Sequence, residues 1–310
     1  PMGTRDKIPV SSMVVAVLVP CLDEETTVAG VVTGFRGALS EATVYVYDNA
    51  SVDGTAKRAA EAGAVVRFES IPGKGSVVRR MFADVDADVY VMADGDGTYD
   101  PADAPLLVKR LVEDNLDMVV GCRVGSTGRL GHAVGNRAFN HLYRWLFGTG
   151  FNDIFSGYRA FSRRYVKSFP AVSTGFEIET EMSVHASQLR LPVAEVDVAF
   201  LARPEGSVSK LRTFSDGWRI LRSMGTLLAG NRPLALFGSL AAISTVAALA
   251  LGAPVVVDFA RTGLVERLPT ALLATGLAVA GLLLAVLGLI LDVVARGRVE
   301  AKRLAYLNSL

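Results

Sequence analysis

Asp94 and Asp96 are the two residues of this 310-residue chain whose types and spacing most directly indicate chemistry. They stand one residue apart, directly after the apolar run 89–93. Two carboxylates at this spacing can share a hard divalent cation, because oxygen ligands favour Mg²⁺ or Mn²⁺. Such an ion offsets the charge of a diphosphate leaving group. The pair therefore indicates a nucleotide diphosphate site, although an acidic turn without a ligand also fits the two residues taken alone.

The elements that would position this pair are strands alternating with helices in a mostly parallel sheet. This α/β pattern rests on apolar runs of strand length at 14–19, 43–47, 65–68, 89–92 and 118–120, and a further strand is expected at 193–200. Polar residues follow three of the runs, at 20–25, 48–51 and 94–97. Because the carboxyl ends of parallel strands meet at one edge of a sheet, we expect these loops to converge.

Two long apolar segments near the end of the chain predict a membrane hairpin over 233–294. The chain is 51% hydrophobic, and neither 233–257 nor 268–291 contains a charged residue. Each segment exceeds the ~20 residues that cross a bilayer core, although two buried core helices would show the same pattern. Arginine and lysine flank the hairpin on its outer sides, which predicts a multi-pass protein of the inner membrane with both ends cytoplasmic.

The residues beside this hairpin are expected to lie at the membrane surface. Segment 213–232 reads as an amphipathic interfacial helix and 295–310 as a cytoplasmic tail. Gly276, Gly281 and Gly288 could pair two copies of the hairpin in a homo-oligomer.

Composition excludes several other classes of protein. A formal net charge of +1, without a dense basic stripe outside the membrane flanks, argues against a nucleic-acid partner. Two cysteines are too few for a disulfide framework, and the three histidines lack the spacing of zinc ligands. Membrane lipids are therefore the expected partners, besides the substrates.

Five short motifs give the chain a resemblance to a known family. In order, they are Val19–Glu25, Asp48–Thr55, Gly73-Lys74-Gly75, Asp94-Gly95-Asp96 and Ser156-Gly157-Tyr158-Arg159. They resemble family 2 glycosyltransferases of the polyprenyl-phosphate branch, such as dolichyl-phosphate mannose synthase and bacterial undecaprenyl-phosphate glucosyltransferases. The resemblance covers about 14–212 and implies a GT-A (Rossmann-like) catalytic domain over 1–212.

The resemblance implies roles on the nucleotide-sugar side of the site. The base and ribose would be held by Pro20, Leu22, Glu24 and Asp48, the nucleotide would be supported by Asp53 and Lys74, and the metal on the diphosphate would be bound by Asp94 and Asp96. Two departures stand out: Asp23 replaces the usual Asn, and Asn49-Ala50 replaces the commoner Asp-Gly, either of which could alter nucleotide preference. UDP-sugars are expected, with GDP-mannose as the alternative.

On the acceptor side, the resemblance implies a phosphate rather than a hydroxyl. A lipid phosphate is already anionic at neutral pH, so it needs cations to align it and no general base. Arg123 and Arg137 resemble the family's arginine pair for this task, although each also reads as a surface charge. Asp153 is assigned a positioning role, with a turn cap as the alternative, and Arg203 and Lys210 bracket a loop that would close over the phosphates or bind headgroups.

These expectations combine into one reaction and two rival functions. The reaction is an inverting, metal-dependent transfer of one sugar to polyprenyl phosphate. A processive polysaccharide synthase is one rival, but the string 141–145 lacks the first residue of the Q-x-x-R-W signature. An inactive membrane scaffold is the other. The acids Glu177, Glu179 and Glu181 read as a solvated helix start.

Overall fold

The computed structural model describes residues 12–124, 143, 151–175, 177–201, 225, 229–230 and 232–309. The chain divides into two compact units, Pro1–Arg212 together with Lys302–Leu310, and Thr213–Ala301. The first unit contains a seven-stranded mixed sheet in the order β3-β2-β1-β4-β6-β5-β7. The second contains two long helices, and each unit is described by itself.

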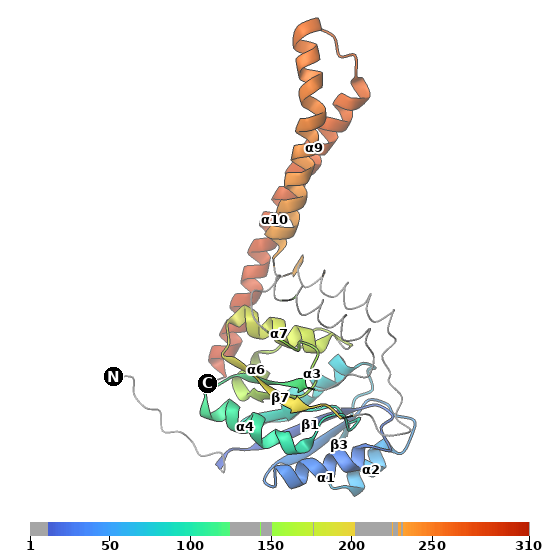
Figure 1. The fold of residues 1–310 in the computed structure, drawn as a ribbon, viewed down its shortest axis with the longest axis vertical. Helices are drawn as coiled ribbons and strands as arrows, with labels where there is room; N and C mark the ends of the chain where they lie inside the picture. Colours follow the sequence, from blue (N-terminus) through green and yellow to red (C-terminus); the bar gives the residue numbers. More distant parts are fainter. Residues whose placement is uncertain are drawn as a thin grey trace, which may run out of the picture. The chain divides into compact units, whose positions relative to one another are not determined.

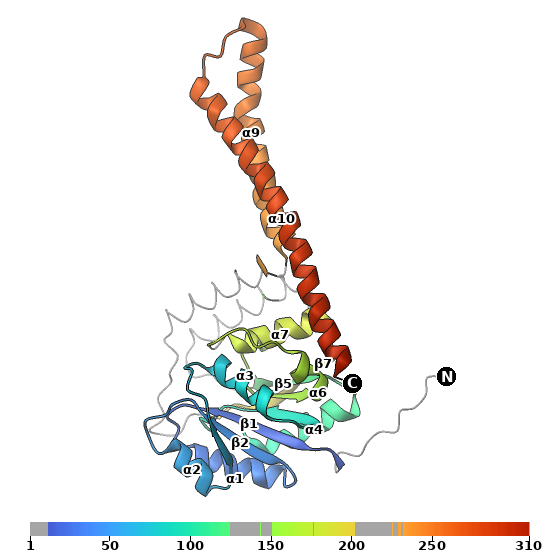
Figure 2. The same cartoon turned by 180° about the vertical axis from the view of Figure 1, so that it is seen from behind.

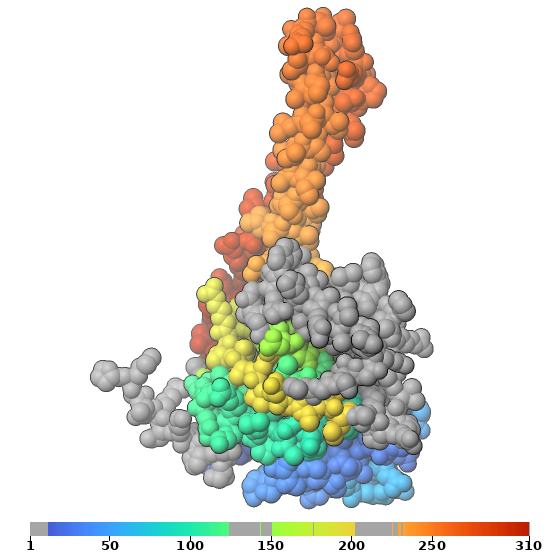
Figure 3. Space-filling model, in the orientation of Figure 1, coloured from blue at the N-terminus to red at the C-terminus, as the bar shows by residue number. Residues whose placement is uncertain are grey.

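The sheet is parallel except for one strand. Its members are β1 (Val15–Cys21), β2 (Thr43–Asp48), β3 (Val65–Phe68), β4 (Val89–Met92), β5 (Met118–Val124), β6 (Arg159–Ser162) and β7 (Val193–Ala199). β6 is antiparallel to both of its neighbours, β4 and β5, while β7 is parallel to β5. The surface of β7 is visible in yellow in the space-filling view (Figure 3). The expected α/β class with a mostly parallel sheet is confirmed, and β6 is a strand that the sequence pattern missed.

Helices cover both faces of this sheet (Figures 1 and 2). They are α1 (Val28–Ala38), α2 (Thr55–Glu61), α3 (Lys74–Asp84), α4 (Ala104–Glu113), α6 (Arg163–Ser168) and α7 (Ile178–Leu189). Alternation along β4 shows the layers, because Val89 and Val91 join the core with α1 and α4, whereas Tyr90 packs edge-on against Phe82 of α3. Burial on both faces explains why the central strands read as continuous apolar runs.

In the second unit, a seam of small residues joins α9 (Pro233–Thr262) to α10 (Leu268–Asn308). The most buried positions recur every seven residues: Ala241, Ala248 and Val255 on α9, and Ala274, Gly281, Gly288 and Ala295 on α10. A Cβ at Gly281 would lie 2.8 Å from Thr245 Oγ1, so the helices approach too closely there for a side chain. Gly281 and Gly288 thus serve packing within the chain, while Gly276 has no atom within 4 Å of a built Cβ.

Both helices are long and apolar enough to cross a membrane. They match the expected spans 233–257 and 268–291 and make α9 and α10 candidate membrane helices. α10 continues without a break to Asn308, so the predicted tail from 295 is helical. Its last turns belong to the first unit, where Tyr306 Oη donates a hydrogen bond to Asp117 Oδ2 at 2.8 Å and Lys302 Nζ donates one to Gln188 at 2.9 Å.

His185 on α7 gives the first unit a pH-dependent stability. The side chain is buried against Tyr165 and Phe169, and burial lowers its pKa to about 3. In the unfolded chain His185 takes up a proton below about pH 6.5, whereas in the folded chain its imidazole stays neutral. The free energy of unfolding therefore falls as the pH drops from about 6.5 toward 3. We expect a loss of roughly 2 kcal/mol by pH 5 from this group.

Unfolding of the detergent-solubilised protein at pH 7 and pH 5 would measure this effect. His185→Phe removes the titrating group, so the free energy of unfolding of this variant should differ less between pH 7 and pH 5. An unchanged difference in the variant would show that other groups carry the pH dependence.

Candidate active site

Three loops beyond the carboxyl ends of β1, β2 and β4 come together, as the strand pattern predicts. The backbone N–H of Asn49 donates to Cys21 O at 2.8 Å and joins the first two loops. Thr27 Oγ1 donates to Gly95 O at 2.7 Å and ties the first loop to the third. Lys74, at the start of α3, contacts Asp94. Most of the predicted donor-side residues therefore lie at one edge of the sheet.

Hydrogen bonds join the first two loops, and in each bond a side-chain oxygen of one loop accepts from a backbone N–H group of the other. Asp23 N donates to Ser51 Oγ at 2.9 Å, and Val52 N donates back to Asp23 Oδ1 at 2.8 Å. Asp23 has φ 49°, a left-handed conformation that Asp and Asn tolerate better than most residues. The departure from the usual Asn thus keeps a residue type suited to this turn.

The residues predicted to bind the nucleotide differ in their burial and in the hydrogen bonds that they make within these loops. Asp48 is buried and accepts from the Ser51 hydroxyl and backbone, while Asp53 accepts from Thr55 N at 3.0 Å. Partial burial opposes the charge of Asp53, but the hydrogen bonds from Thr55 and Glu25 outweigh it and lower the pKa of the carboxyl. Asp53 therefore shapes the loop. Pro20 lies inside β1, Glu24 is buried and Leu22 is exposed beside them.

Asn49 fixes the segment that leads into α3. Its amide nitrogen donates to Glu69 O at 2.8 Å and to Ile71 O at 2.9 Å, and its amide oxygen accepts from Gly73 N at 2.8 Å. An aspartate offers no donor for the two carbonyls, so the amide is required for this arrangement. The departure noted in the sequence thus orders the approach to Lys74.

Lys74 joins three elements through two carboxylates. Its ammonium lies 2.5 Å from Asp94 Oδ1 and 2.5 Å from Glu179 Oε1, and the side chain is 10% exposed. Burial opposes its charge, but Asp94 and Glu179 outweigh this and raise the pKa of Lys74. Lys74 is therefore a fixed cation beside the acid that was predicted to bind metal.

Glycines bring the neighbouring backbone close to this lysine. A Cβ at Gly73 would lie 2.1 Å from Thr174 O, and a Cβ at Gly75 would lie 2.1 Å from Ser173 O. Glu181 holds the same segment from α7, because its carboxylate accepts from Val172 N at 3.0 Å and Ser173 N at 2.7 Å. Both glycines of the Gly73-Lys74-Gly75 motif are therefore needed for close packing.

The two acids after β4 have a donor set that fits a divalent cation. Asp96 is 6% exposed, and its Oδ1 accepts from Thr98 N at 3.1 Å and Thr98 Oγ1 at 2.6 Å. Glycine is required between the acids, because a Cβ at Gly95 would lie 2.3 Å from Cys21 Sγ. A Cβ at Gly157 would likewise lie 2.7 Å from Asp94 Oδ2 and fill the space beside that oxygen.

Two carboxylates suit Mg²⁺ or Mn²⁺ that takes its remaining ligands from phosphate oxygens and water. Within the described residues no group of three or more His, Cys, Asp or Glu side chains forms a metal cluster.

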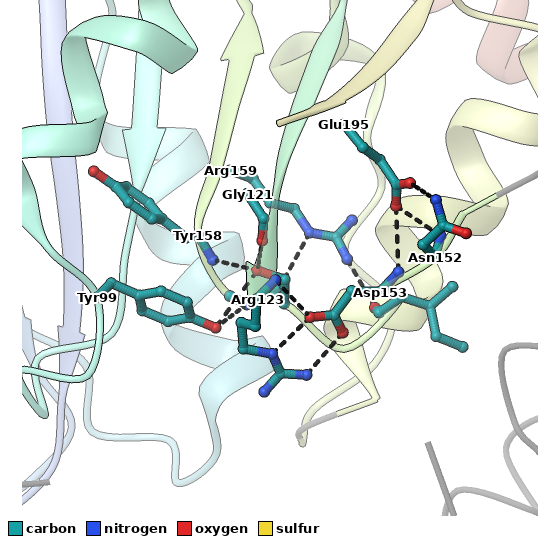
Figure 4. Close-up of polar contacts among 11 residues, drawn as sticks. Tyr99, Gly121, Arg123, Asn152, Asp153, Tyr158, Arg159 and Glu195 are labelled. Carbon is teal, nitrogen blue, oxygen red and sulfur yellow. Dashed lines mark hydrogen bonds and ion pairs between the residues drawn. The ribbon is translucent and has the colours of Figure 1, made fainter. Parts of the chain in front are cut away.

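Arg123 and Asp153 form a bidentate ion pair at the end of β5 (Figure 4). Arg123 Nε donates to Asp153 Oδ2 at 2.6 Å, and Nη2 donates to Oδ1 at 2.7 Å. The guanidinium also lies 5.4 Å from the centre of the Phe200 ring. Burial opposes its charge, but the hydrogen bonds that Arg123 donates to Asp153 outweigh this and raise the pKa of Arg123. Asp153 thus holds a permanently charged arginine at the end of β5.

Glu195 on β7 in turn holds the loop that carries Asp153. Its Oε1 accepts from Asn152 N at 2.8 Å and Asp153 N at 3.2 Å, and its Oε2 accepts from Asn152 Nδ2 at 2.7 Å (Figure 4). Tyr99, from the loop after the acid pair, accepts from Gly157 N at 3.0 Å. The loop 152–157 is therefore fastened both to β7 and to the acid-pair loop.

Arg159 supports the same loop from inside the protein. The side chain is fully buried and donates to Ser156 O at 2.8 Å, Ile154 O at 2.8 Å and Ser183 Oγ at 3.0 Å. Burial lowers the pKa of Arg159. This residue of the Ser156–Arg159 motif is thus a structural organiser of the loop, not a ligand-binding charge.

Replacing Arg159 with methionine is expected to lower the free energy of unfolding by about 3–5 kcal/mol, because buried carbonyls lose their donors. Arg163→Met, on the exposed part of α6, should change it by less than about 1 kcal/mol. Thermal or denaturant unfolding in detergent compares the two variants. Equal effects would mean that the buried guanidinium does not hold the loop.

Some predicted residues cannot be placed, and some important ones were missed. Arg137, Arg203 and Lys210 lie outside the described residues, as do most residues of the predicted interfacial helix. The expectation of a solvated helix start at α7 was wrong, since Glu179 and Glu181 are buried at 4% and 6% exposure. Glu195 and Tyr99 were also missed, whereas Asn49 was noted only as a departure from the family's pattern. For Glu179 and Glu181, the alternation of acids along 177–181 was the available signal.

Comparison with known proteins gives this geometry a family. A family model described as glycosyl transferase family 2 matches residues 16–169. The glycosyltransferase AglJ of Haloferax volcanii is 37% identical over 243 residues, covering 76% of this chain and 79% of that protein. An undecaprenyl-phosphate mannosyltransferase of Micrococcus luteus is 27% identical over 211 residues, covering 63% of this chain and 86% of that protein.

Among solved structures, the fold is similar to glucosyl-3-phosphoglycerate synthase of Mycobacterium tuberculosis. The complex with Mn²⁺, UDP and glucosyl-3-phosphoglycerate has a TM-score of 0.60 and 22% sequence identity, covering 71% of this chain and 81% of that one. At this identity the likeness establishes the shared fold and leaves the acceptor open.

Proposed function

This chain belongs to glycosyl transferase family 2, and we propose that it transfers one sugar from a nucleotide sugar to the phosphate of a polyprenyl phosphate, with inversion at the anomeric carbon. UDP-sugars are the proposed donors, with GDP-mannose as the alternative. The products are a polyprenyl-phosphate monosaccharide and a nucleoside diphosphate.

The observation that carries the choice of acceptor is the Arg123–Asp153 pair. A hydroxyl acceptor needs a base to take its proton, and a carboxylate that faces a guanidinium through both oxygens serves less well as that base than one that faces the acceptor. Both Asp153 oxygens already accept hydrogen bonds from Arg123. A phosphate acceptor needs no base and is aligned by a cation, which the Arg123 guanidinium of the pair would supply. The name of the Micrococcus luteus relative supports the same acceptor class.

On the donor side, Asp94 and Asp96 are proposed to hold Mg²⁺ or Mn²⁺ against the diphosphate, which would lower the energy of the departing negative charge. Lys74 adds a fixed positive charge next to them. A phosphate oxygen of the lipid forms the new bond to the anomeric carbon from the face opposite the diphosphate. The old bond breaks with its electron pair on the diphosphate, so no proton is transferred.

The two apolar helices give this reaction a proposed place. A polyprenyl phosphate is insoluble in water, and α9 with α10 would keep the catalytic unit at the membrane where the lipid resides. We place that unit and the chain's C-terminus on the cytoplasmic side of the inner membrane, from the positive flanks of the hairpin.

Transfer by the purified full-length protein tests the proposal. The protein in lipid nanodiscs would receive a panel of UDP- and GDP-sugars, Mg²⁺ or Mn²⁺, and either polyprenyl phosphate or the unphosphorylated polyprenol. Mass spectrometry should find a lipid carrying one sugar only with the phosphorylated acceptor. Sugar on the polyprenol would indicate a hydroxyl acceptor, a ladder of masses would indicate the processive synthase, and no product would support the scaffold.

A further inference from the structure

Glu179 is a buried acid beside the proposed metal site for which the reaction above has no role. It lies in the first turn of α7, more than 80 residues along the chain from the metal acids, and its side chain is 5% exposed. Its Oε1 accepts from Lys74, whereas its Oε2 is buried without a hydrogen-bond partner among the described residues. Burying a carboxylate in this way costs free energy, so its presence here calls for an explanation.

The charges around Lys74 suggest that reason. One ammonium lies 2.5 Å from each of two carboxylates, Asp94 and Glu179, so its positive charge is shared between them. If Glu179 were neutral, Lys74 would pair with Asp94 alone and neutralise it. A cation arriving at Asp94 would then have to displace a full ion pair. With Glu179 charged, the trio keeps a net charge of −1, and Lys74 retains a partner when Asp94 turns to the cation.

We propose that Glu179 is a positioning residue that holds the Lys74 ammonium and thereby keeps Asp94 available for a divalent cation. This rests on the proposed donor chemistry and deepens it, because it assigns a role to a residue outside the acid pair. The ammonium has three donors, and two of them have acceptors among the described residues. The third is left for an oxygen of the nucleotide diphosphate.

A simple structural role for Glu179 predicts something different. If Glu179 only stabilised the packing of α3 against α7, its loss would loosen these helices. Binding of the cation and binding of the metal-free nucleotide would then weaken together. If Glu179 acts on Lys74 and Asp94, its loss weakens binding of the divalent cation. Nucleotide binding without metal then stays the same or improves, because a negative charge has been removed. Metal-free nucleotide binding therefore separates the two roles, because it weakens only under the purely structural role.

Calorimetric binding of UDP and GDP to the full-length protein in nanodiscs, over a series of Mn²⁺ concentrations and without metal, separates these cases. For Glu179→Gln, we expect the half-saturating Mn²⁺ concentration to rise at least about tenfold, the range found when partners of metal ligands are changed. Metal-free nucleotide binding should not weaken. The matched control is Asp117→Asn, which removes the charge of another buried acid, placed directly before β5 at the opposite edge of the sheet, and it should leave the Mn²⁺ requirement unchanged.

A double-mutant cycle shows whether Glu179 acts through the lysine. In a Lys74→Met background, Glu179→Gln should raise the Mn²⁺ requirement far less than it does in the natural chain. An unchanged Mn²⁺ requirement in the single variant, a parallel loss of metal-free binding, or full additivity would each overturn the proposal. If metal does not strengthen UDP or GDP binding by the natural chain, the donor-site proposal falls and this inference with it. Failure of lipid transfer alone leaves the binding test intact.

Discussion

Replacing Arg123 with methionine is expected to lower the rate of transfer to polyprenyl phosphate by at least about 100-fold, the scale found when one donor that stabilises reacting charge is removed. The guanidinium is fixed by Asp153 and lies against Phe200, so its positive charge is held in one place, and methionine removes that charge. Initial rates over a range of lipid-phosphate concentrations measure the effect. Binding of UDP with Mn²⁺ should remain, because the donor loops are built by other residues.

Asp153→Asn distinguishes a positioning acid from a base. The amide keeps the shape and one acceptor oxygen but loses the charge that faces Arg123, so we expect a loss of about tenfold that appears mainly in KM for the lipid phosphate. Arg123→Lys should fall between the wild-type chain and Arg123→Met, since an ammonium cannot reproduce the two-point contact. A loss beyond about 10,000-fold in Asp153→Asn with an unchanged KM would identify Asp153 as a general base and overturn the phosphate acceptor.

Replacing Asp96 with alanine is expected to have the largest effect on the donor side, a loss of about 1000-fold in kcat or roughly 4 kcal/mol of barrier. Its carboxylate is buried and oriented by Thr98, so it is prepared to bind a cation before the nucleotide arrives. Rates with saturating Mn²⁺, together with Mn²⁺-dependent UDP binding, provide the measurement. Both should be lost together.

Thr98→Val is the matched control for this acid. It removes the hydroxyl donor to Asp96 but leaves the carboxylate and the Thr98 backbone donor, so we expect weaker Mn²⁺ binding and a loss of rate nearer tenfold. If Asp96→Ala kept metal-dependent nucleotide binding and most of its rate, the acid pair would not be the metal site.

The strands and the loops that follow them were predicted well because they rest on local patterns. β3 and β4 begin and end at the expected residues, and β1, β2 and β5 differ by one to four residues at their ends. In a parallel sheet, a buried apolar run and the polar residue after it are adjacent in the chain. The family resemblance then gave the GT-A fold, and the family match confirms it. The individual site roles remain predictions.

Two elements show where local reading fails. β6 is short and contains Arg159, so nothing in its composition indicates a central strand, and its place between β4 and β5 follows from pairing with both. The start of α7 reads as polar and exposed, but Glu179 is buried at its ion pair with Lys74 of α3. In each case a partner distant in the chain decides the environment.

The sequence by itself determined the family, the sheet edge where chemistry collects, and the two apolar helices, because each depends on residue type and on spacing within a few turns of chain. Only the tertiary structure decided how charges pair across that edge. Lys74 meets Glu179, Arg123 meets Asp153, and Asn152 meets Glu195 over separations of 105, 30 and 43 residues. Such pairs form because burial makes an unmatched charge or donor costly, and which partner meets it depends on how the chain returns through the fold.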